Sequence, residues 1–415
     1  MQNKTLRSVL IVFVAIVLVV CVFGGGFAAG HFLPFGSTNT QILTTSPTTT
    51  GNQGGTPADL QSEFAPFWQA WNLVHQNYVD QPVNDTAMIQ GALKGMMSSL
   101  PTGLNYYETP EEYQTTQAQL NGTDYTGIGA WVDTSKAYLT VVSPMSGSPA
   151  EKAGLLPGDQ ITAIDGKDMT GITPEVVRTE VLGPEGTSIT LTILRQGVDK
   201  PFDVTITRAK ITQPLVESRM LDNNIAYIHL FTFGDSAAQD VHNALQELLA
   251  QNPKGLILDL RYNTGGYVDQ AISIASEFLP ADKIVFYEKA SDGTLTPHAS
   301  LGNGIASSIP TVVLVNEWSA SASEIVSGAL QDYGRAKLVG VTTYGKGSEQ
   351  IPVPLDNNQG LVGITIATWL TPNQRFIQGT GLTPDVVVEM TQADATAGKD
   401  QQLDAAVQLI LNPQP

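Results

Sequence analysis

Ser321 is the first residue whose type and position could do covalent chemistry. It lies in SASASE, residues 319–324, where an amphipathic helix is expected to begin. Glu324 follows three residues later, which is the spacing of a helix capping box. A helix N-terminus also suits a nucleophile, because free backbone N–H groups and the helix dipole stabilise negative charge on an attacked carbonyl. By pattern alone, Ser321 is either a helix cap or a nucleophile.

A serine nucleophile needs a base, and Lys346 is the candidate. None of the five histidines lies in a known triad signature: His31, His75, His229, His242 and His298. Lys346 lies between Gly345 and Gly347, which permit tight backbone packing around its ammonium group. A free lysine titrates near ~10.4, so a base role requires burial that lowers its pKa. Glu349 is expected to point elsewhere. The alternative is a solvated loop lysine.

Two glycine pairs could present backbone N–H groups to a ligand. Gly265 and Gly266 follow the expected strand LILDLR, and with the N–H of Ala322 they could form an oxyanion hole; the alternative is a plain turn. The segment Gly127, Ile128 and Gly129 could hold a peptide carboxylate beside an added strand. Val176 and Val177, on an expected short helix, would flank that peptide or pack in a core.

The surrounding pattern predicts the elements that position these residues. From about residue 211, apolar strands alternate with amphipathic helices, which indicates an α/β sheet covered by helices. Residues from about 125 to 208 read as short strands and turns around one helix. Residues 59 to 120 read as helical, and an aromatic stripe that includes Phe64, Phe67, Trp68 and Trp71 is expected to lie in a core.

The N-terminus predicts a membrane anchor. Lys4 and Arg7 precede a long uncharged apolar run within residues 9–30, long enough to span a bilayer. A cleaved signal peptide, and a lipoprotein modified at Cys21, are the alternatives. Residues 31–58 read as a flexible stalk. These features predict a single-pass protein of the cell membrane with an extracytoplasmic catalytic part, or a secreted protein if the segment is cleaved.

Charge and motifs exclude several function classes. The formal net charge is −18, which argues against nucleic acid as a partner. The single cysteine rules out an intramolecular disulfide. The sequence has no zinc-binding or nucleotide-binding motif, so no metal or cofactor is expected.

Four motifs together resemble a known family. They are SPAEKAGLLPGDQITAIDG at 148–166, LILDLRYNTGG at 256–266, LVNEWSASASEIVSGALQDYGRA at 314–336, and GVTTYGKGSEQ at 340–350 with TPNQRFIQGTGLTPDVVV following. In order and spacing, the chain from about residue 64 to 412 resembles the carboxyl-terminal processing peptidases, also called tail-specific proteases. It differs from the family at Thr264, where proline is frequent, and at LPTGLNYYETPEEY.

The resemblance implies a role for each candidate residue. Ser321 would be the nucleophile, Lys346 its general base, and Gln350 a neutral hydrogen-bonding partner that orients the lysine. The implied fold is an α/β core of the crotonase/ClpP type, with an inserted, mostly-β PDZ domain and an N-terminal helical region. The expected domains are 1–8 cytoplasmic tail, 9–30 transmembrane anchor, 31–58 stalk, 59–120 helical region, 121–209 PDZ domain and 210–415 peptidase core.

The expected function is a serine endopeptidase that cleaves exported proteins near their C-termini. Its partners would be proteins or peptides with apolar C-termini, bound by the PDZ domain; oligomerisation is left open. Two other classes compete: a catalytically silent PDZ adaptor, and an acyl-CoA enzyme on a crotonase-like core. Intact Ser321, Lys346 and Gln350 argue against the adaptor. The predicted anchor, stalk and PDZ domain argue against the acyl-CoA enzyme.

Overall fold

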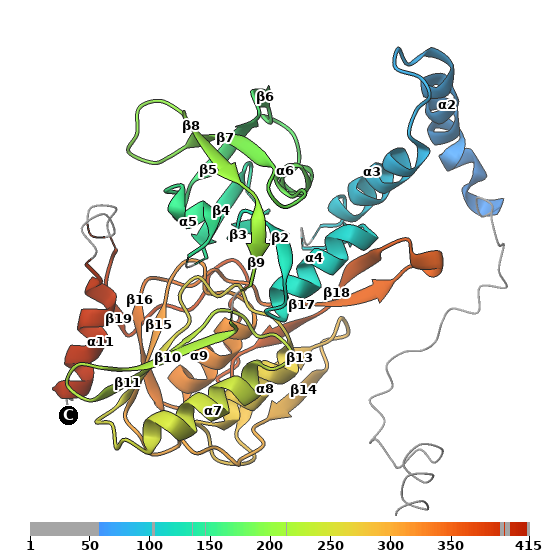
Figure 1. Ribbon diagram of the computed structural model, residues 1–415. Coiled ribbons are helices and arrows are strands. Elements are labelled where there is room, and N and C mark those ends of the chain that lie inside the picture. Colours follow the sequence, from blue (N-terminus) through green and yellow to red (C-terminus); the bar gives the residue numbers. More distant parts are fainter. Residues whose placement is uncertain are drawn as a thin grey trace, which may run out of the picture. The chain divides into compact units, whose positions relative to one another are not determined.

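A computed structural model describes residues 58–101, 104–134, 136–145, 147–212, 214–390, 394 and 399–412. The chain divides into two units, Met1–Asn84 and Asp85–Pro415. Figure 1 labels the elements along the chain. The predicted tail, the predicted anchor and nearly all of the predicted stalk lie outside the described residues.

The expected location in the cell membrane is wrong. Among the described residues, no helix is both long enough and apolar enough to cross a bilayer. This finding contradicts the predicted single-pass location in the cell membrane.

The described part of the first unit consists of the short helix η1 (Ala58–Leu60) and α2 (Gln61–Asn77). The aromatic rings of α2 contact one another, with 5.0 Å between the centroids of Phe67 and Trp68 and 6.4 Å between those of Trp68 and Trp71. The expectation that this stripe lies in a core is wrong, since no residue of α2 is buried. Helical spacing places side chains on one face, but only a covering element can bury them.

In the second unit, α3 (Asp85–Ser98), β1 (Tyr106–Glu108) and α4 (Pro110–Leu120) come first. The start of α4 carries a full capping box. Thr109 N–H donates to Glu112 Oε2 at 2.9 Å, and Glu112 N–H donates to Thr109 Oγ1 at 3.2 Å. Pro110 occupies the first turn, where its missing N–H costs nothing.

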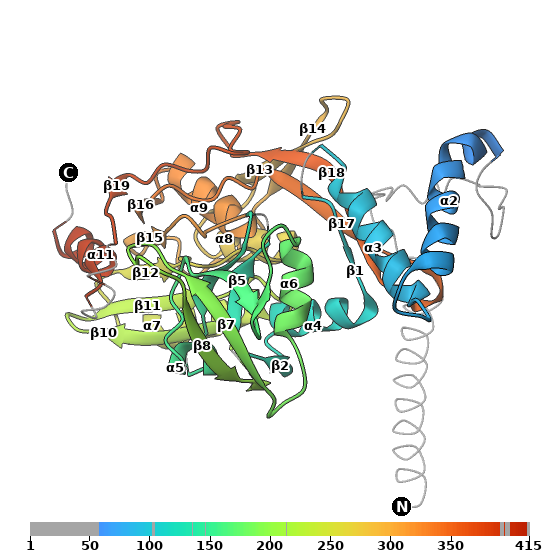
Figure 2. The same ribbon diagram turned by 90° about the horizontal axis from the view of Figure 1, so that it is seen from above.

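A mostly-β module follows, as expected. Its main sheet has the order β3-β4-β5-β7-β8, with β6 beside β5, while β2 pairs with β9. Val177 and Val181 of α6 pack with strand residues such as Leu139 and Leu191 in one apolar core. Figure 2 shows α6 beside the strands of this module. The elements are β2 (Tyr125–Gly127), β3 (Ala130–Asp133), β4 (Leu139–Pro144), α5 (Pro149–Lys152), β5 (Gln160–Ile164), β6 (Lys167–Asp168), α6 (Pro174–Val181), β7 (Ser188–Leu194), β8 (Phe202–Thr207) and β9 (Ala209–Ile211).

The α/β part holds a six-stranded sheet of order β10-β11-β12-β15-β16-β19, in which only the β10–β11 pair is antiparallel. Its strands are β10 (Val216–Leu221), β11 (Ile225–Leu230), β12 (Leu256–Asp259), β15 (Thr311–Val315), β16 (Ala336–Gly340) and β19 (Val386–Val387). The helices are α7 (Ala237–Leu249), α8 (Val268–Ser276), α9 (Ala322–Asp332) and α11 (Gln401–Leu411).

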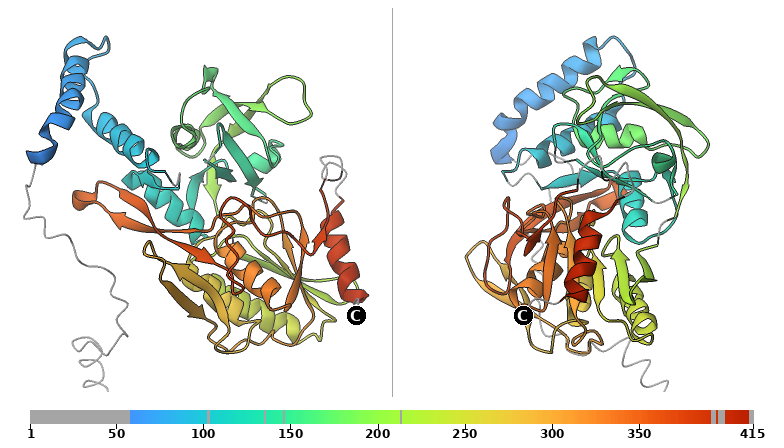
Figure 3. Two further views of the ribbon diagram at one scale, coloured as in Figure 1. Left: turned by 180° about the vertical axis from the view of Figure 1, so that it is seen from behind. Right: turned by 90° about the vertical axis from the view of Figure 1, so that its left-hand side faces the viewer.

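Both faces of the central strands of this sheet are covered, which is why β11, β12 and β15 are mainly apolar. Leu256 and Leu258 face the core that α7, α8 and α9 complete. Ile257, between them, faces Ala406 and Ile410 of α11. Figure 3 shows α11, in red, away from the yellow-green α7.

A second sheet of the α/β part has the order β1-β18-β13-β14, with β17 paired to β18. It comprises β13 (Ile284–Lys289), β14 (Leu295–Ala299), β17 (Ser348–Pro354) and β18 (Leu361–Leu370), in addition to β1; the short helix η2 (Asp356–Asn358) joins β17 to β18. The chain thus has mixed sheets with helices and a separate β module. The narrower expectation of a crotonase/ClpP-like core stays a prediction.

Candidate active site

The site forms where three neighbouring parallel strands end. The Gly265–Gly266 segment follows β12, Ser321 follows β15, and Lys346 follows β16. The pairs β12–β15 and β15–β16 are both parallel. Because parallel strands end at the same edge of a sheet, residues separated by up to 81 positions in sequence meet there.

Ser321 holds an unusual backbone conformation at the N-cap position of α9, with φ 55° and ψ −116°. A positive φ is strained for a residue with a β-carbon, and such strain concentrates at functional sites. Gly265, with φ 108°, backs closely onto this serine. A β-carbon on Gly265 would lie 2.8 Å from Cβ of Ser321, so only glycine fits.

Glu324 ties the start of α9 to the lysine loop. Its carboxylate accepts hydrogen bonds from Ser321 N–H at 2.9 Å, Gly345 N–H at 2.7 Å, Lys346 N–H at 2.9 Å and the Thr343 hydroxyl at 2.6 Å. The side chain is fully buried. Burial raises the pKa of Glu324, and these hydrogen bonds oppose the rise. The capping-box spacing predicted only the bond to Ser321; the bonds to the lysine loop were missed, because they span 19 to 22 residues.

Two backbone N–H groups beside Ser321 remain available. Gly265 N–H donates to Asn263 Oδ1 at 2.9 Å, and Gly265 O accepts from Phe233 N–H at 3.0 Å. By contrast, no described residue accepts a hydrogen bond from the N–H of Gly266 or of Ala322. The sequence could not decide between the two glycines; these bonds leave Gly266 as the one with a free donor.

Lys346 lines the same cavity as Ser321. Burial lowers the pKa of Lys346, and the negative charge of Glu324 partly opposes this. Its Nζ makes no hydrogen bond or ion pair with any residue that the structure describes, while its carbonyl accepts from Trp369 Nε1 at 3.1 Å. The flanking glycines are needed for close packing: a β-carbon on Gly345 would lie 2.8 Å from Gly381 N, and one on Gly347 would lie 2.9 Å from Gln378 N.

Gln350 also lines this cavity, but its observed partners are not the lysine. Its Nε2 donates to Ser348 Oγ at 2.9 Å and to Thr365 Oγ1 at 3.2 Å. No hydrogen bond to Lys346 occurs among the described residues, so the orienting role stays a prediction. These two bonds hold the amide nitrogen and leave the amide oxygen for another partner.

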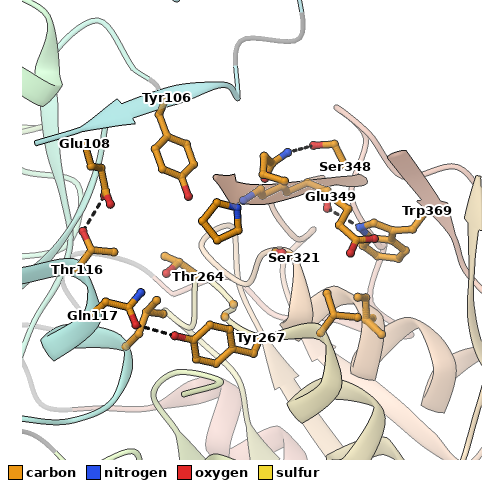
Figure 4. A pocket seen from close by; sticks show the side chains of 18 of the residues that line it. Tyr106, Glu108, Thr116, Gln117, Thr264, Tyr267, Ser321, Ser348, Glu349 and Trp369 are labelled. Carbon is orange, nitrogen blue, oxygen red and sulfur yellow. Dashed lines mark hydrogen bonds between the residues drawn. The ribbon is translucent and has the colours of Figure 1, made fainter. Parts of the chain in front are cut away.

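The cavity has a volume of about 260 Å³. Figure 4 shows Glu349 and Trp369 on one side of Ser321, and Tyr106, Glu108, Thr116 and Gln117 on the other. Glu349 shares this cavity, although it is not among the charges that act on the pKa of Lys346. None of the described histidines lines it; His242 pairs with Glu277 and His298 with Glu288.

A second, smaller cavity lies in the β module. Ile128 and Gly129 line it, as do Arg178, Val181 and Leu182 at the end of α6, and α4 contributes Thr115 and Gln119. Gly129 has φ 76°, and a β-carbon there would lie 2.5 Å from Cβ of Ser148, so this position requires glycine.

The helix positions predicted to flank a peptide do not line this cavity. Val177 is 2% exposed and packs in the module core, and Val176 is 36% exposed. The sequence missed Arg178 and Val181 because helical spacing alone does not show which turn faces the groove. Gly127, at the end of β2, is absent from the lining as well. Peptide binding by the five predicted residues stays a prediction.

The parts of the chain that the structure describes contain no group of three or more His, Cys, Asp or Glu residues placed to hold a metal. The chemistry available at the larger cavity is that of a hydroxyl, an amine with a lowered pKa and two free N–H donors.

Comparison with known proteins identifies the family. Residues 224–388 match the model of peptidase family S41, and residues 140–195 match that of the PDZ domain. The chain is 37% identical over 382 residues to a carboxy-terminal-processing protease of Bartonella bacilliformis, covering 91% of this chain and 85% of that protein. This chain belongs to peptidase family S41, the carboxyl-terminal processing proteases.

Other members give the same result. The peptidase is 36% identical over 351 residues to a carboxyl-terminal-processing protease of Synechocystis sp., covering 82% of this chain and 81% of that protein. Among solved structures, it is similar to a photosystem II D1 C-terminal processing protease, with a TM-score of 0.63, 28% identity and coverage of 79% of this chain and 93% of the other. The peptidase is therefore a serine-type endopeptidase with a PDZ domain, as the motifs predicted.

Proposed function

We propose that this peptidase cleaves protein substrates near their C-termini with Ser321 as nucleophile and Lys346 as general base. One observation carries the proposal: Ser321 and Lys346 line one cavity, and burial lowers the pKa of that lysine. A lowered pKa is what allows an amine to accept a proton near neutral pH.

The proton transfers follow from this assignment. Neutral Lys346 takes the hydroxyl proton of Ser321 as Oγ bonds to the substrate carbonyl carbon. The N–H groups of Gly266 and Ala322 stabilise the oxyanion that forms. The carbon–nitrogen bond then breaks, and Lys346 returns the proton to the leaving amine. Water, deprotonated by Lys346, attacks the acyl carbon; the bond from that carbon to Ser321 Oγ breaks, and Lys346 returns the proton to Oγ.

The test is Ser321→Ala, with Ser327→Ala as the matched control. Ser327 lies on the same helix, and its buried hydroxyl has no hydrogen-bond partner among the described residues, so its removal breaks no hydrogen bond there. We expect Ser321→Ala to lose peptidase activity while retaining the wild-type melting temperature, and Ser327→Ala to keep both. Turnover by a folded Ser321→Ala protein would show that another residue is the nucleophile. Mass spectrometry of the cleaved protein would locate the cut.

We further propose that the PDZ domain binds the substrate's C-terminus. The positive φ and tight packing of Gly129, and its place beside a small cavity, support a carboxylate-binding loop here. Amidating the C-terminus of a peptide substrate should raise its KM, because the carboxylate charge is lost, with less effect on kcat. Equal KM and kcat for the amidated and free forms would show that the PDZ domain does not select substrates by their C-terminal carboxylate.

A further inference from the structure

Glu349 is a carboxylate in the wall of the active-site cavity that the proposed mechanism does not use. It lies on β17 opposite Ala367 of β18, and two residues further along β18, Trp369 lies opposite Glu288 of β13. Alternation along β18 puts Ala367 and Trp369 on the same face of the sheet. Figure 4 accordingly shows Glu349 next to Trp369, to one side of Ser321.

Glu349 differs from Glu108, the other carboxylate in this wall, because no described residue is its partner. Glu108 accepts a hydrogen bond from the Thr116 hydroxyl at 2.7 Å and forms an ion pair with Arg178 at 3.7 Å. Glu349 makes no hydrogen bond or ion pair with any residue in the described part of the chain. Among the described residues that line the cavity, the only cationic side chain is that of Lys346, which must be neutral to act as a base.

The surroundings make a negative charge on Glu349 costly. Burial and the nearby carboxylate of Glu288 raise the pKa of Glu349, and His298 opposes the rise weakly. His298 is already hydrogen-bonded to Glu288 at 3.1 Å. A cation that entered the cavity would offset the lost hydration and the repulsion from Glu288 together.

The aromatic side chains beside Glu349 suit the rest of such a ligand. Trp369 and Phe286 both line the cavity, with ring centroids 6.5 Å apart in an edge-to-face arrangement. The methylene stem of a lysine or arginine packs against apolar rings while its charged end reaches a polar group. An aromatic wall that ends in an unpaired carboxylate is the arrangement that such a side chain fits.

We propose that Glu349 makes the cavity beside Ser321 selective for substrates that place a lysine or arginine side chain there, next to the bond to be cleaved. The inference rests on the proposed function, because the side chain in question belongs to the peptide that Ser321 attacks. It identifies Glu349 as a specificity-determining residue on the Trp369 side of the cavity.

The experiment compares peptides that differ in one residue. Each carries lysine, norleucine or glutamate at the position before or after the scissile bond, with the same free C-terminus. Norleucine keeps the straight methylene chain of lysine without its charge. For the wild type, we expect kcat/KM for lysine to exceed that for norleucine by about tenfold to a hundredfold at one of the two positions, the range a charge-assisted hydrogen bond contributes.

Glu349→Gln should reduce this lysine-to-norleucine ratio to about one, since the amide keeps the size of the side chain and removes its charge. Glu349→Lys should reverse the preference, so that the glutamate peptide is cleaved faster than the lysine peptide. Glu217→Gln is the matched control: it makes the same change at an exposed position on β10 and should leave the ratio unchanged. Thermal unfolding of each variant checks that the fold is intact.

Two failures can be told apart. If the wild type cleaves the norleucine and lysine peptides equally at both positions, or if Glu349→Gln retains the wild-type ratio, the selectivity assigned to Glu349 is wrong and the proposed function stands. If folded wild type cleaves none of the peptides, nor any protein substrate, the proposed function fails and the selectivity fails with it.

Discussion

At the scale of single residues, the chemistry depends on one proton on Lys346. The free amine is the form that can deprotonate Ser321, and it predominates above the lysine's own pKa. Burial lowers that pKa from its ordinary value. The active form is therefore reached at a lower pH than a solvent-exposed lysine would require.

The first prediction concerns this titration. Activity should rise with pH along a single step centred below the ordinary lysine pKa. Lys346→Arg should lose about a hundredfold or more in kcat, because a guanidinium stays protonated at any usable pH. The check is a pH profile of kcat/KM for the wild type, beside single-pH assays of the variant. A Lys346→Arg peptidase with near-normal turnover would show that the residue supplies charge and no base.

At the scale of elements, the site depends on how loops from different strands are tied together. Asn263, after β12, accepts Ala320 N–H at 3.0 Å and the Ser323 hydroxyl at 2.8 Å through its backbone carbonyl. Glu324, on α9, accepts from the loop that follows β16. These hydrogen bonds fix the three strand ends relative to one another, and α9 takes part in both sets of bonds.

The second prediction tests the Glu324 tie. Glu324→Ala should lower the free energy of unfolding by about 3 kcal/mol or more, because it leaves buried N–H donors without an acceptor. It should also reduce kcat, since Ser321 and Lys346 lose their common anchor. The matched control is Glu151→Ala, at the equivalent position of α5: that carboxylate accepts Gly147 N–H but is exposed, so its loss should cost less than about 1 kcal/mol. Urea unfolding of the two variants is the measurement. Equal losses in the free energy of unfolding would show that Glu324 does not hold these loops together.

At the scale of the whole second unit, a buried charge network joins the sheet to α11. Arg261 pairs with Asp259 at 2.6 Å and with Asp400 at 2.8 Å, where Asp400 is the N-cap of α11. Asp259 also accepts from Tyr227 Oη at 2.8 Å. Burial by itself would raise the pKa of Asp259; the charges of Arg261 and His229 and the hydrogen bonds from Arg261 outweigh burial and lower it to about 2.

The third prediction follows from the sign of that shift. A carboxyl whose pKa is depressed in the folded state contributes stability above its ordinary pKa and loses it as pH falls toward about 2. Arg261→Leu should lower the free energy of unfolding at pH 7 by about 3–5 kcal/mol, because it leaves Asp259 buried and unpaired. The free energy of unfolding of this variant should also depend less on pH in the acid range than that of the wild type. Unfolding curves for wild type and variant from pH 7 to pH 3 are the measurement, and parallel pH dependence would contradict the assignment.

Local pattern was enough for the central strands of the six-stranded sheet and the helices beside them. It did not predict β13, β14, β17 and β18, and β1 lies in the stretch that was read as helical. The strands LILDL and TVVLV and the helices that follow them appear where their apolar periodicity indicated, because backbone propensity and side-chain spacing act over a few residues. The motifs around Ser321, Lys346 and the PDZ-like stretch identified the family. Their chemical types also named most of the candidate site, since a serine, a glycine-flanked lysine and paired glycines are visible one by one.

Only the tertiary structure decided which groups share a cavity and which are already satisfied. Gly265 and Gly266 look alike in sequence, but the bond from Gly265 N–H to Asn263 leaves Gly266 as the free donor. Elements far away in sequence also decide three other features. These are the four hydrogen bonds that Glu324 accepts, the burial of Val177 and the exposure of the α2 aromatic side chains. Glu349 looks like an ordinary strand residue until β13 and β18 bring Glu288 and Trp369 beside it. Hydrogen-bond satisfaction and burial are properties of neighbours in space, and the chain order of residues does not contain them.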